Sequence, residues 1–158
     1  PLTAGKRQRR RTAVKLTIRP ATADDAEGFA AVFADRNASL GTLQHPYTTA
    51  ELWRTRLAAA PAGNRQAMFV ALVNGRIVGN AGVHPVSDNP RQRHVCGIGI
   101  SIMTRYQGLG IGRELIRRTH EACGKQTMLV LIAAPQAESY YPHIGLQQHH
   151  SCWFLPRE

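Results

Sequence analysis

A glycine-rich turn between an apolar strand and a basic helix is the feature that most constrains this fold. The strand is predicted over 94–103, the turn over 104–110, and the helix from Ile111 to Gly124. Glycines leave the backbone N–H groups of the turn uncovered, and the first turn of a helix points further unpaired N–H groups the same way. Such an arrangement attracts phosphate. The chain is therefore predicted to be an α/β protein organised around a phosphate-binding turn.

The glycine spacing excludes two common nucleotide-binding turns. A P-loop ends in Gly-Lys-Ser or Gly-Lys-Thr, whereas Gly112 is followed by arginine and glutamate. A dinucleotide-binding turn has its last two glycines three residues apart, but Gly108, Gly110 and Gly112 are two apart. The acid that binds a ribose about 20 residues later is also missing, because 129–133 is apolar. A different phosphate compound is indicated.

Composition and charge indicate one ordinary globular domain. The chain has 158 residues, of which 43% are hydrophobic, enough for a single domain with a buried core. Residues 1–13 lack apolar periodicity and are expected to form a flexible basic arm, with one domain over 14–158. The net charge is +10, and five positive charges lie in the first eleven residues, so +10 less five leaves +5 for the rest. The arm is either a solvated tail or a segment that binds nucleic acid or an acidic partner.

The chemistry of the cysteines and the absence of long apolar runs predict a cytoplasmic protein. No run approaches the roughly 20 apolar residues that span a bilayer, and no signal peptide is visible. Cys96, Cys123 and Cys152 are odd in number and widely spaced, which favours buried free thiols in a reducing compartment. No metal is expected, because the adjacent His149 and His150 point to opposite faces of a strand.

The hydrophobic pattern predicts a central mixed, twisted sheet flanked by helices, with the element order β-α-α-β-β-β-α-β-α-β. An Asn74-Gly75 pair predicts a type I′ hairpin. The run 127–133 is expected to be buried on both faces, and Gly97 and Gly99 to leave one face of the central strand nearly bare. Besides the elements already given, strands are predicted over 14–19, 68–73, 77–83, 127–133 and 146–155, and helices over 22–37, 48–60 and 135–143.

Two motifs in this framework resemble those of the GNAT superfamily of acetyl-CoA-dependent N-acetyltransferases. Gln107-x-x-Gly110-x-Gly112 matches the family pattern Arg/Gln-x-x-Gly-x-Gly/Ala. The run 140–146, Tyr-Tyr-Pro-His-Ile-Gly-Leu, is similar to the family signature Phe/Tyr-Tyr-x-x-x-Gly-Phe. The predicted order of elements is also the family's, so the resemblance covers about 14–155.

The resemblance implies a GNAT fold, an acyltransferase activity and acetyl-CoA as co-substrate. It gives Tyr141 the role of proton donor to the departing thiolate, with simple packing against the coenzyme as the alternative. A backbone N–H of the central strand near Ile100 is expected to stabilise the developing oxyanion. The residues expected to bind coenzyme A are Ile100, Ile102, Met103, Gln107, Gly108, Leu109, Gly110, Ile111, Gly112 and Arg113.

The general base does not follow from the resemblance. Many members carry an acid on the central strand, but 95–103 contains none and position 97 is a glycine. The candidates are His84, His94, and Glu27 acting through water. His84 is preferred, because an imidazole is suited to accept a proton near neutral pH. Direct reaction of an already neutral amine is the alternative.

The acceptor is predicted mainly from the loop 37–49, which carries few charges. This composition favours a small, partly apolar primary amine, including amino acids, over polyamines or aminoglycosides. Two alternatives stay open: a protein Lys or N-terminal acetyltransferase, and a protein that binds nucleic acid or a partner through its basic arm. Ala134 replaces an asparagine common in the family, and the chain is short after Leu146. These departures leave open one coenzyme contact and a homodimer.

Overall fold

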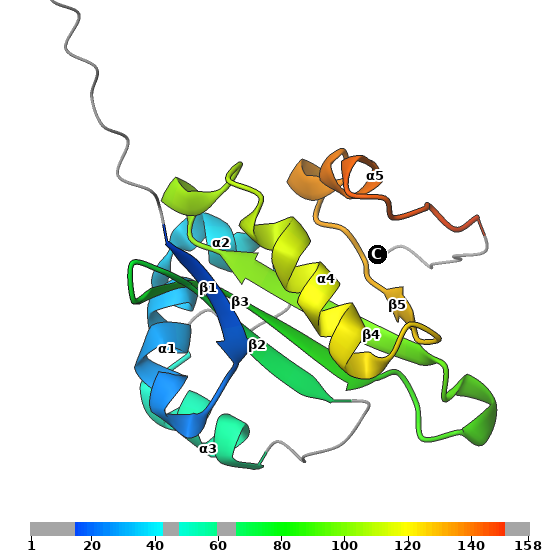
Figure 1. Ribbon diagram of the computed structural model, residues 1–158, viewed down its shortest axis with the longest axis horizontal. Helices are drawn as coiled ribbons and strands as arrows, with labels where there is room; N and C mark the ends of the chain where they lie inside the picture. The colour runs from blue at the N-terminus through cyan, green and yellow to red at the C-terminus, as the bar shows by residue number, and fades with distance from the viewer. Residues whose placement is uncertain (1–14, 43–47, 60–65, 151–158) are drawn as a thin grey trace, which may run out of the picture.

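The computed structural model describes residues 15–42, 48–59 and 66–150, which form a five-stranded sheet with helices on both faces (Figure 1). The sheet order follows the sequence, with antiparallel pairing throughout the first four strands and parallel pairing between the last two. The predicted α/β class with a mixed sheet is confirmed. The strands are β1 (Leu16–Pro20), β2 (Ala67–Val73), β3 (Arg76–Pro85), β4 (Val95–Ile102) and β5 (Met128–Val130).

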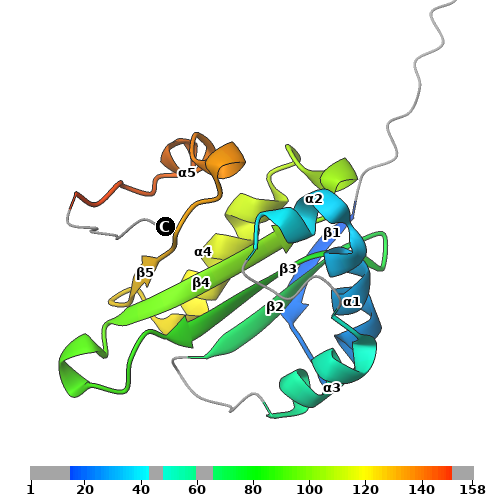
Figure 2. The ribbon, with the colours of Figure 1, turned by 180° about the vertical axis from the view of Figure 1, so that it is seen from behind.

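Two helical layers enclose the sheet, as Figures 1 and 2 show from opposite sides. One layer consists of α1 (Ala26–Ala34), α2 (Arg36–Leu40) and α3 (Ala50–Ala59). The other contains α4 (Ile111–Cys123), with the short α5 (Tyr140–His143) beyond it. Short 3-10 turns lie at 23–25, 90–92, 104–106 and 135–137. Within the described part of the chain, no helix combines the length and apolar character needed to cross a bilayer.

Helix α4 has the predicted amphipathic character. Its buried face is formed by five side chains that the hydrophobic pattern assigned to the core, and its arginines point to solvent. Gly124, with φ of 88°, ends the helix as predicted. The buried side chains are Ile111, Leu115, Ile116, Thr119 and Cys123.

The helix predicted over 22–37 is interrupted, which corrects that prediction. Asp35 is extended, with φ of −70° and ψ of 114°, and separates α1 from α2. Its carboxylate accepts hydrogen bonds from the Ala38 N–H at 3.2 Å, as the N-cap of α2, and from the Thr104 hydroxyl at 2.6 Å. The break has a tertiary cause, because Thr104 lies 69 residues away in the chain.

The β2–β3 hairpin contains the predicted type I′ turn and, beyond it, a bulge. Asn74 and Gly75 have positive φ values of 50° and 82°, as this turn requires. Leu72 pairs with Ile77, but Ala71 pairs with Gly79, so β3 contains one extra residue, Val78. Beyond a bulge of this kind, the side chains that regular alternation would place on one face of the sheet lie on the other.

The bulge determines what faces each helical layer. Ile77 and Val78 already belong to opposite hydrophobic clusters, with Ile77 on the α1/α3 side. After the bulge, Asn80 pairs with Val70, a residue of the α1/α3 cluster. Ala81 packs in the α4 cluster. The even-numbered residues of β3 from 80 to 84 therefore face the α1/α3 layer.

The predicted strand 127–133 is shorter and more exposed than expected. Only β5 (Met128–Val130) is a strand, and Met128, Val130 and Ile132 are 52%, 38% and 88% exposed. Among the described residues β5 is the edge of the sheet, and only one of its faces packs, through Leu129, against the α4 side. Burial on both faces was therefore a wrong prediction. Residues 146–150 also form no strand, and the rest of that predicted strand lies outside the described residues.

Candidate functional site

The glycine turn presents open backbone at the start of α4. Gly108 and Gly110 have φ values of 74° and 79°, a region that favours glycine, and no atom lies within 4 Å of a Cβ built on either. Gln107 donates a hydrogen bond from Nε2 to the carbonyl of Ile102 at 3.0 Å, which joins the turn to the end of β4. The N–H groups of the first helical turn have no acceptor within the helix. The turn is therefore suited to bind an anion.

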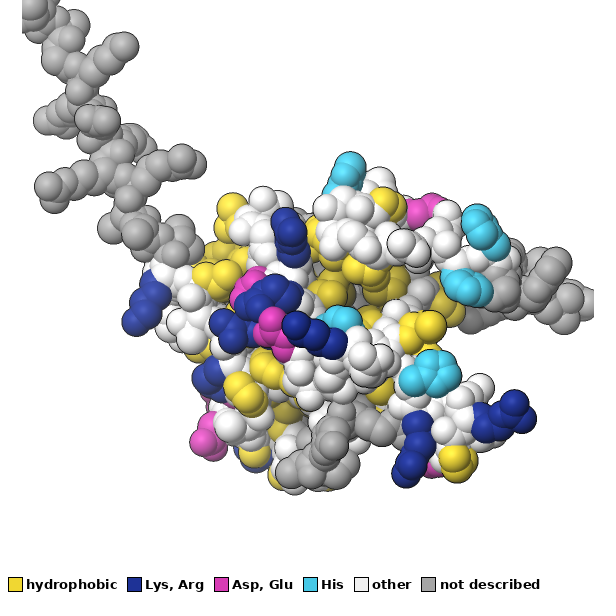
Figure 3. All heavy atoms as spheres, turned by 45° about the vertical axis from the view of Figure 1, so that its right-hand side comes forward, with side chains coloured by type: hydrophobic (Ala, Val, Ile, Leu, Met, Phe, Trp, Pro, Cys, Tyr) yellow, Lys and Arg dark blue, Asp and Glu magenta, His cyan; other side chains and the backbone are white. Residues whose placement is uncertain are grey.

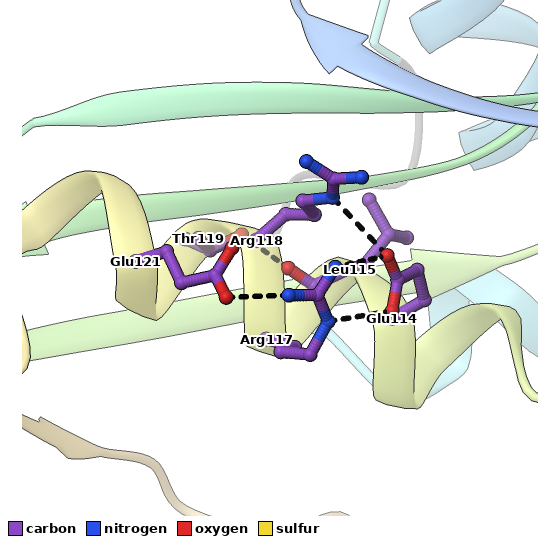
Figure 4. A network of polar contacts seen from close by, with 6 residues as sticks. All are labelled: Glu114, Leu115, Arg117, Arg118, Thr119 and Glu121. Carbon is purple, nitrogen blue, oxygen red and sulfur yellow. Dashed lines mark hydrogen bonds and ion pairs between the residues drawn. The ribbon is translucent and has the colours of Figure 1, made fainter.

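The charges on α4 leave a positive group at its N-terminus. Figure 4 shows Glu114 between Arg117 and Arg118, and Arg117 also pairs with Glu121. Hydrogen bonds from Arg117, followed by those from Arg118, lower the pKa of the Glu114 carboxyl to about 2. Among the described residues Arg113 makes no ion pair, so its charge is available to a ligand at the turn.

The outer edge of β4 is open next to this turn. Pairing with β5 ends at Gly97, which lies opposite Val130, although β4 continues to Ile102. The Met103 N–H donates to the Val78 carbonyl of β3 at 2.9 Å, and its carbonyl accepts from Tyr106. Because backbone groups alternate along a strand, the groups of Ile100 point away from β3 toward the open edge. The N–H and the carbonyl of Met103, predicted to contact the coenzyme, each already make one hydrogen bond within the protein.

Two adjacent tyrosines lie on the α4 side of this edge. Tyr141 packs against the cluster that contains Ile98, and burial raises the pKa of its phenol. The Tyr140 hydroxyl lies 2.6 Å from the place of a Cβ on Gly112, at the first turn of α4. Burial raises the pKa of Tyr140, whereas Arg113 opposes that shift. Figure 3 shows a hollow lined by hydrophobic side chains between the charged face of α4 and the α5 segment.

His84 lies on the other face of the sheet, over Gly97. The two residues are cross-strand partners, and a Cβ on Gly97 would meet the His84 Nε2 at 2.6 Å. The face expected to be bare is thus covered at Gly97, which is buried, and open only at Gly99, where nothing lies within 4 Å of a Cβ. An imidazole therefore occupies the space in which an acid at position 97 would stand.

The other candidate bases are less well placed. Glu27 is exposed on α1. His94 lies just before β4, at the end of the strand far from the glycine turn.

Two residues predicted to contact the coenzyme differ in exposure. Leu109 is 59% exposed on the turn, whereas Ile111 is buried in the hydrophobic core beneath α4.

Four residues near this site were not predicted from the sequence. Tyr140 was passed over for its neighbour, and the link from Asp35 to Thr104 has no local sequence signal. Asn80 is 5% exposed, and its Nδ2 is buried with no hydrogen-bond partner. The signal that could have identified it is its position as the single polar residue between Ile77 and Val83 of β3.

Comparison with known families and curated proteins gives a consistent result. Residues 15–139 match the family of the acetyltransferase (GNAT) domain. The chain is also similar to the L-amino acid N-acetyltransferase AaaT of Escherichia coli (strain K12), with 32% identity over 109 residues. The matched region is 69% of this chain and 65% of that protein, so the chain spans just under two thirds of its relative.

Solved structures share the fold at lower identity. An acetyltransferase of the GNAT family from Streptococcus pneumoniae has a TM-score of 0.69 at 24% identity, covering 82% of this chain and 81% of that one. Glucosamine-6-phosphate N-acetyltransferase from Arabidopsis thaliana has a TM-score of 0.69 at 14% identity, covering 91% and 99%. The Salmonella typhimurium protein yncA, a putative acetyltransferase solved with its cofactor acetyl-CoA, has a TM-score of 0.59 at 17% identity, covering 70% and 64%.

Proposed function

Because the chain belongs to the GNAT acetyltransferase family, we propose that it moves the acetyl group of acetyl-CoA to a primary amine. The observation that carries this proposal is the glycine turn at the N-terminus of α4, beside the unpaired edge of β4. A backbone cradle with left-handed glycines and no side chain above it fits a pyrophosphate. The open strand edge fits the extended, amide-bearing arm of coenzyme A.

The residues proposed to hold the coenzyme act through backbone and charge. The N–H groups of 108–112 would bind the pyrophosphate, with the dipole of α4 and the charge of Arg113 adding favourable interactions. The outward groups of Ile100 and Ile102 would pair with the pantetheine arm, while the Gln107 side chain holds the carbonyl of Ile102 in place. The bound co-substrate supplies an acetyl thioester.

His84 is proposed as the general base. Its imidazole lies over Gly97, on the face of β4 that the α1/α3 layer borders, and it remains exposed at the end of β3. It would accept the proton that the amine nitrogen loses as the new C–N bond forms. The absence of an acid on β4 is explained in this way, because the histidine ring fills the corresponding space.

Tyr141 is proposed as the general acid. It would give a proton to the sulfur as the C–S bond breaks, while a backbone N–H near Ile100 stabilises the charge on the carbonyl oxygen. A tyrosine phenol ordinarily ionises near pH 10, and burial raises the pKa of Tyr141 further, so its proton is present at neutral pH. His84 and Tyr141 lie on opposite faces of the sheet, with the open edge of β4 between them.

The acceptor is proposed to be a small amine of the amino-acid class. This assignment is supported by the similarity to a protein named L-amino acid N-acetyltransferase. It agrees with the open backbone at Gly99, on which small groups can lie closely.

A panel assay tests the proposed function. The full chain is given acetyl-CoA with the twenty amino acids, simple alkylamines, polyamines, and peptides bearing a lysine or a free N-terminus, and release of free coenzyme A is followed. We expect turnover with amino acids or small amines and little with peptides. Turnover restricted to peptides would favour protein acetylation, and a folded protein with no turnover on any amine would overturn the proposal.

A further inference from the structure

Six residues of β3 and β4 form three cross-strand rows on the face toward the α1/α3 layer. The middle row is Gly82 and Gly99: Gly99 is exposed with no atom within 4 Å of a Cβ, whereas Gly82 is half-buried beside the Met68 side chain. The row toward one end is His84 with Gly97, and the row toward the other end is Asn80 with Ser101. We call the middle row the glycine floor.

Asn80 is the unexplained member of this set. Only 5% of its surface is exposed, and its Nδ2 has neither solvent contact nor a hydrogen-bond partner in the structure. A buried donor without an acceptor is costly, and native proteins keep few of them. Thr48 and Trp53 also hold an unpartnered polar atom, but both precede or belong to α3, whereas Asn80 lies on the sheet beside the glycine floor.

The spacing of the rows suits a small acceptor molecule. His84 lies four positions after Asn80 along β3, which corresponds to about 13 Å in an antiparallel strand. A hydrogen bond of about 3 Å at the Asn80 end and one bridging water, about 6 Å, at the His84 end leave roughly 4 Å for the acceptor. That length fits an α-amino acid, whose amine nitrogen and carboxylate oxygen are separated by two carbon atoms.

We propose that the Asn80 side-chain amide recognises the acceptor, donating a hydrogen bond from Nδ2 to a carboxylate oxygen of an amino acid that lies over the glycine floor. The inference rests on the proposed function and adds to it a group that selects the acceptor. The reacting amine then lies toward His84, and the carboxylate toward Asn80 and Ser101. A carboxylate is the acceptor oxygen that gains most from such a donor, because hydrogen bonds to charged groups are the stronger ones.

The test compares acceptors that differ only in the carboxylate. Each amino acid that the full-length enzyme acetylates is paired with the amine that lacks its carboxylate, such as leucine with 3-methylbutylamine. Asn80→Leu, which keeps the size and removes the donor, is expected to lower kcat/KM for the amino acid about tenfold or more, mainly through KM. For the matched amine the change is expected to stay within about threefold, and KM for acetyl-CoA is expected to be unchanged.

Two controls separate recognition from folding. Asn80→Leu is expected to melt at or above the temperature of the native chain, because it removes a buried donor that has no partner. Thr119→Val changes an equally buried polar side chain on the α4 side, whose hydroxyl donates to the Leu115 carbonyl at 2.6 Å. This variant is expected to change kcat/KM for the amino acid and for the matched amine by the same factor.

The outcomes distinguish this inference from the proposed function. Equal losses on the amino acid and on the matched amine, or a melting temperature several degrees lower for Asn80→Leu, would assign Asn80 a structural role and overturn the inference alone. Higher kcat/KM of the native enzyme for the matched amines than for the amino acids would also overturn the inference alone. Failure of every amine with the folded native chain would overturn the proposed function and this inference with it.

Discussion

His84 and Gly97 depend on one another because the imidazole ring lies where a side chain at position 97 would stand. In Gly97→Ala the new Cβ would meet Nε2 at 2.6 Å, so the exposed ring must swing away. We expect kcat/KM to fall about tenfold or more, as when a positioned base is displaced. Steady-state kinetics with the amine found in the panel assay measures the loss.

A double-mutant cycle shows whether that loss passes through the histidine. If displacement of the ring is the cause, Gly97→Ala adds little to the loss already seen in His84→Ala. Additive losses would mean that Gly97 acts on the reaction by another route, and full activity in Gly97→Ala would remove His84 as the base.

Tyr141 and Tyr140 offer a matched pair of phenols. Tyr141→Phe is expected to lower kcat about a hundredfold while KM for acetyl-CoA changes little, because only the proton donor is removed. Since burial raises the pKa of Tyr141, the native enzyme is expected to keep its activity into the alkaline range until that phenol ionises.

Tyr140→Phe is the control for this change. Its hydroxyl lies at Gly112, beside the glycine turn proposed to bind the pyrophosphate, so its loss is expected to raise KM for acetyl-CoA and leave kcat largely intact. If the two variants exchanged these effects, Tyr140 would be the proton donor, and the role assigned from the family motif would be wrong.

At the scale of elements, Asp35 joins the α1/α3 layer to the start of the glycine turn, because its carboxylate binds Thr104. Its carboxylate accepts hydrogen bonds from the hydroxyl and the N–H of Thr104, and the hydroxyl is the main cause of its lowered pKa. A lowered pKa in the folded state means stabilisation that is present above about pH 4 and is lost as the pH falls through the folded value.

Asp35→Ala is therefore expected to lower the free energy of unfolding at pH 7 by about 1 kcal/mol, the usual cost of losing such a cap. Denaturant titrations at pH 7 and pH 3 measure the difference from the native chain, which is expected to shrink at the lower pH. Asp24→Ala, at an exposed position in the preceding turn, serves as the control. An equal loss at both pH values would show that the carboxylate charge is not involved.

Elements whose chemistry is local could be predicted from the sequence, and those with distant partners could not. The positive φ of Gly110 and the Asn74-Gly75 turn follow from the residues themselves. The interruption at Asp35 depends on Thr104, and the ring over Gly97 depends on the register of β3 against β4. Alternation alone cannot give that register, because the extra residue Val78 reverses which face the rest of β3 presents.

At the scale of the whole molecule, the main opening in the sheet begins beyond Gly97, where the pairing of β4 with β5 ends. Four strands pair antiparallel across most of their length, whereas β5 joins β4 through only three residue pairs, from Val95 opposite Met128 to Gly97 opposite Val130. The segment after β5 therefore has few backbone bonds to the sheet, and a ligand in the opening would contact both sides.

Acetyl-CoA is expected to stabilise these two sides unequally. At about 100 times its Kd it should stabilise the fold by about 2.7 kcal/mol, which thermal melting would detect. Hydrogen exchange is expected to slow most over 97–113 and 128–145 and least over α3, which lies in the helical layer on the other face of the sheet from α4. Protection spread evenly over all strands would contradict binding at the β4–β5 opening.

The bulge at Val78 also limits how the length of this chain can change. Removing Val78 alone would abolish the bulge and leave Asn80 and His84 on their present face, because regular alternation from Ile77 gives the same result. Removing two residues between Ile77 and Asn80 would turn Asn80 and His84 toward α4 and bring Ala81 and Val83 to the α1/α3 side. Once the extra residue is gone, further insertions or deletions in β3 are compatible with the proposed site only when they are even in number.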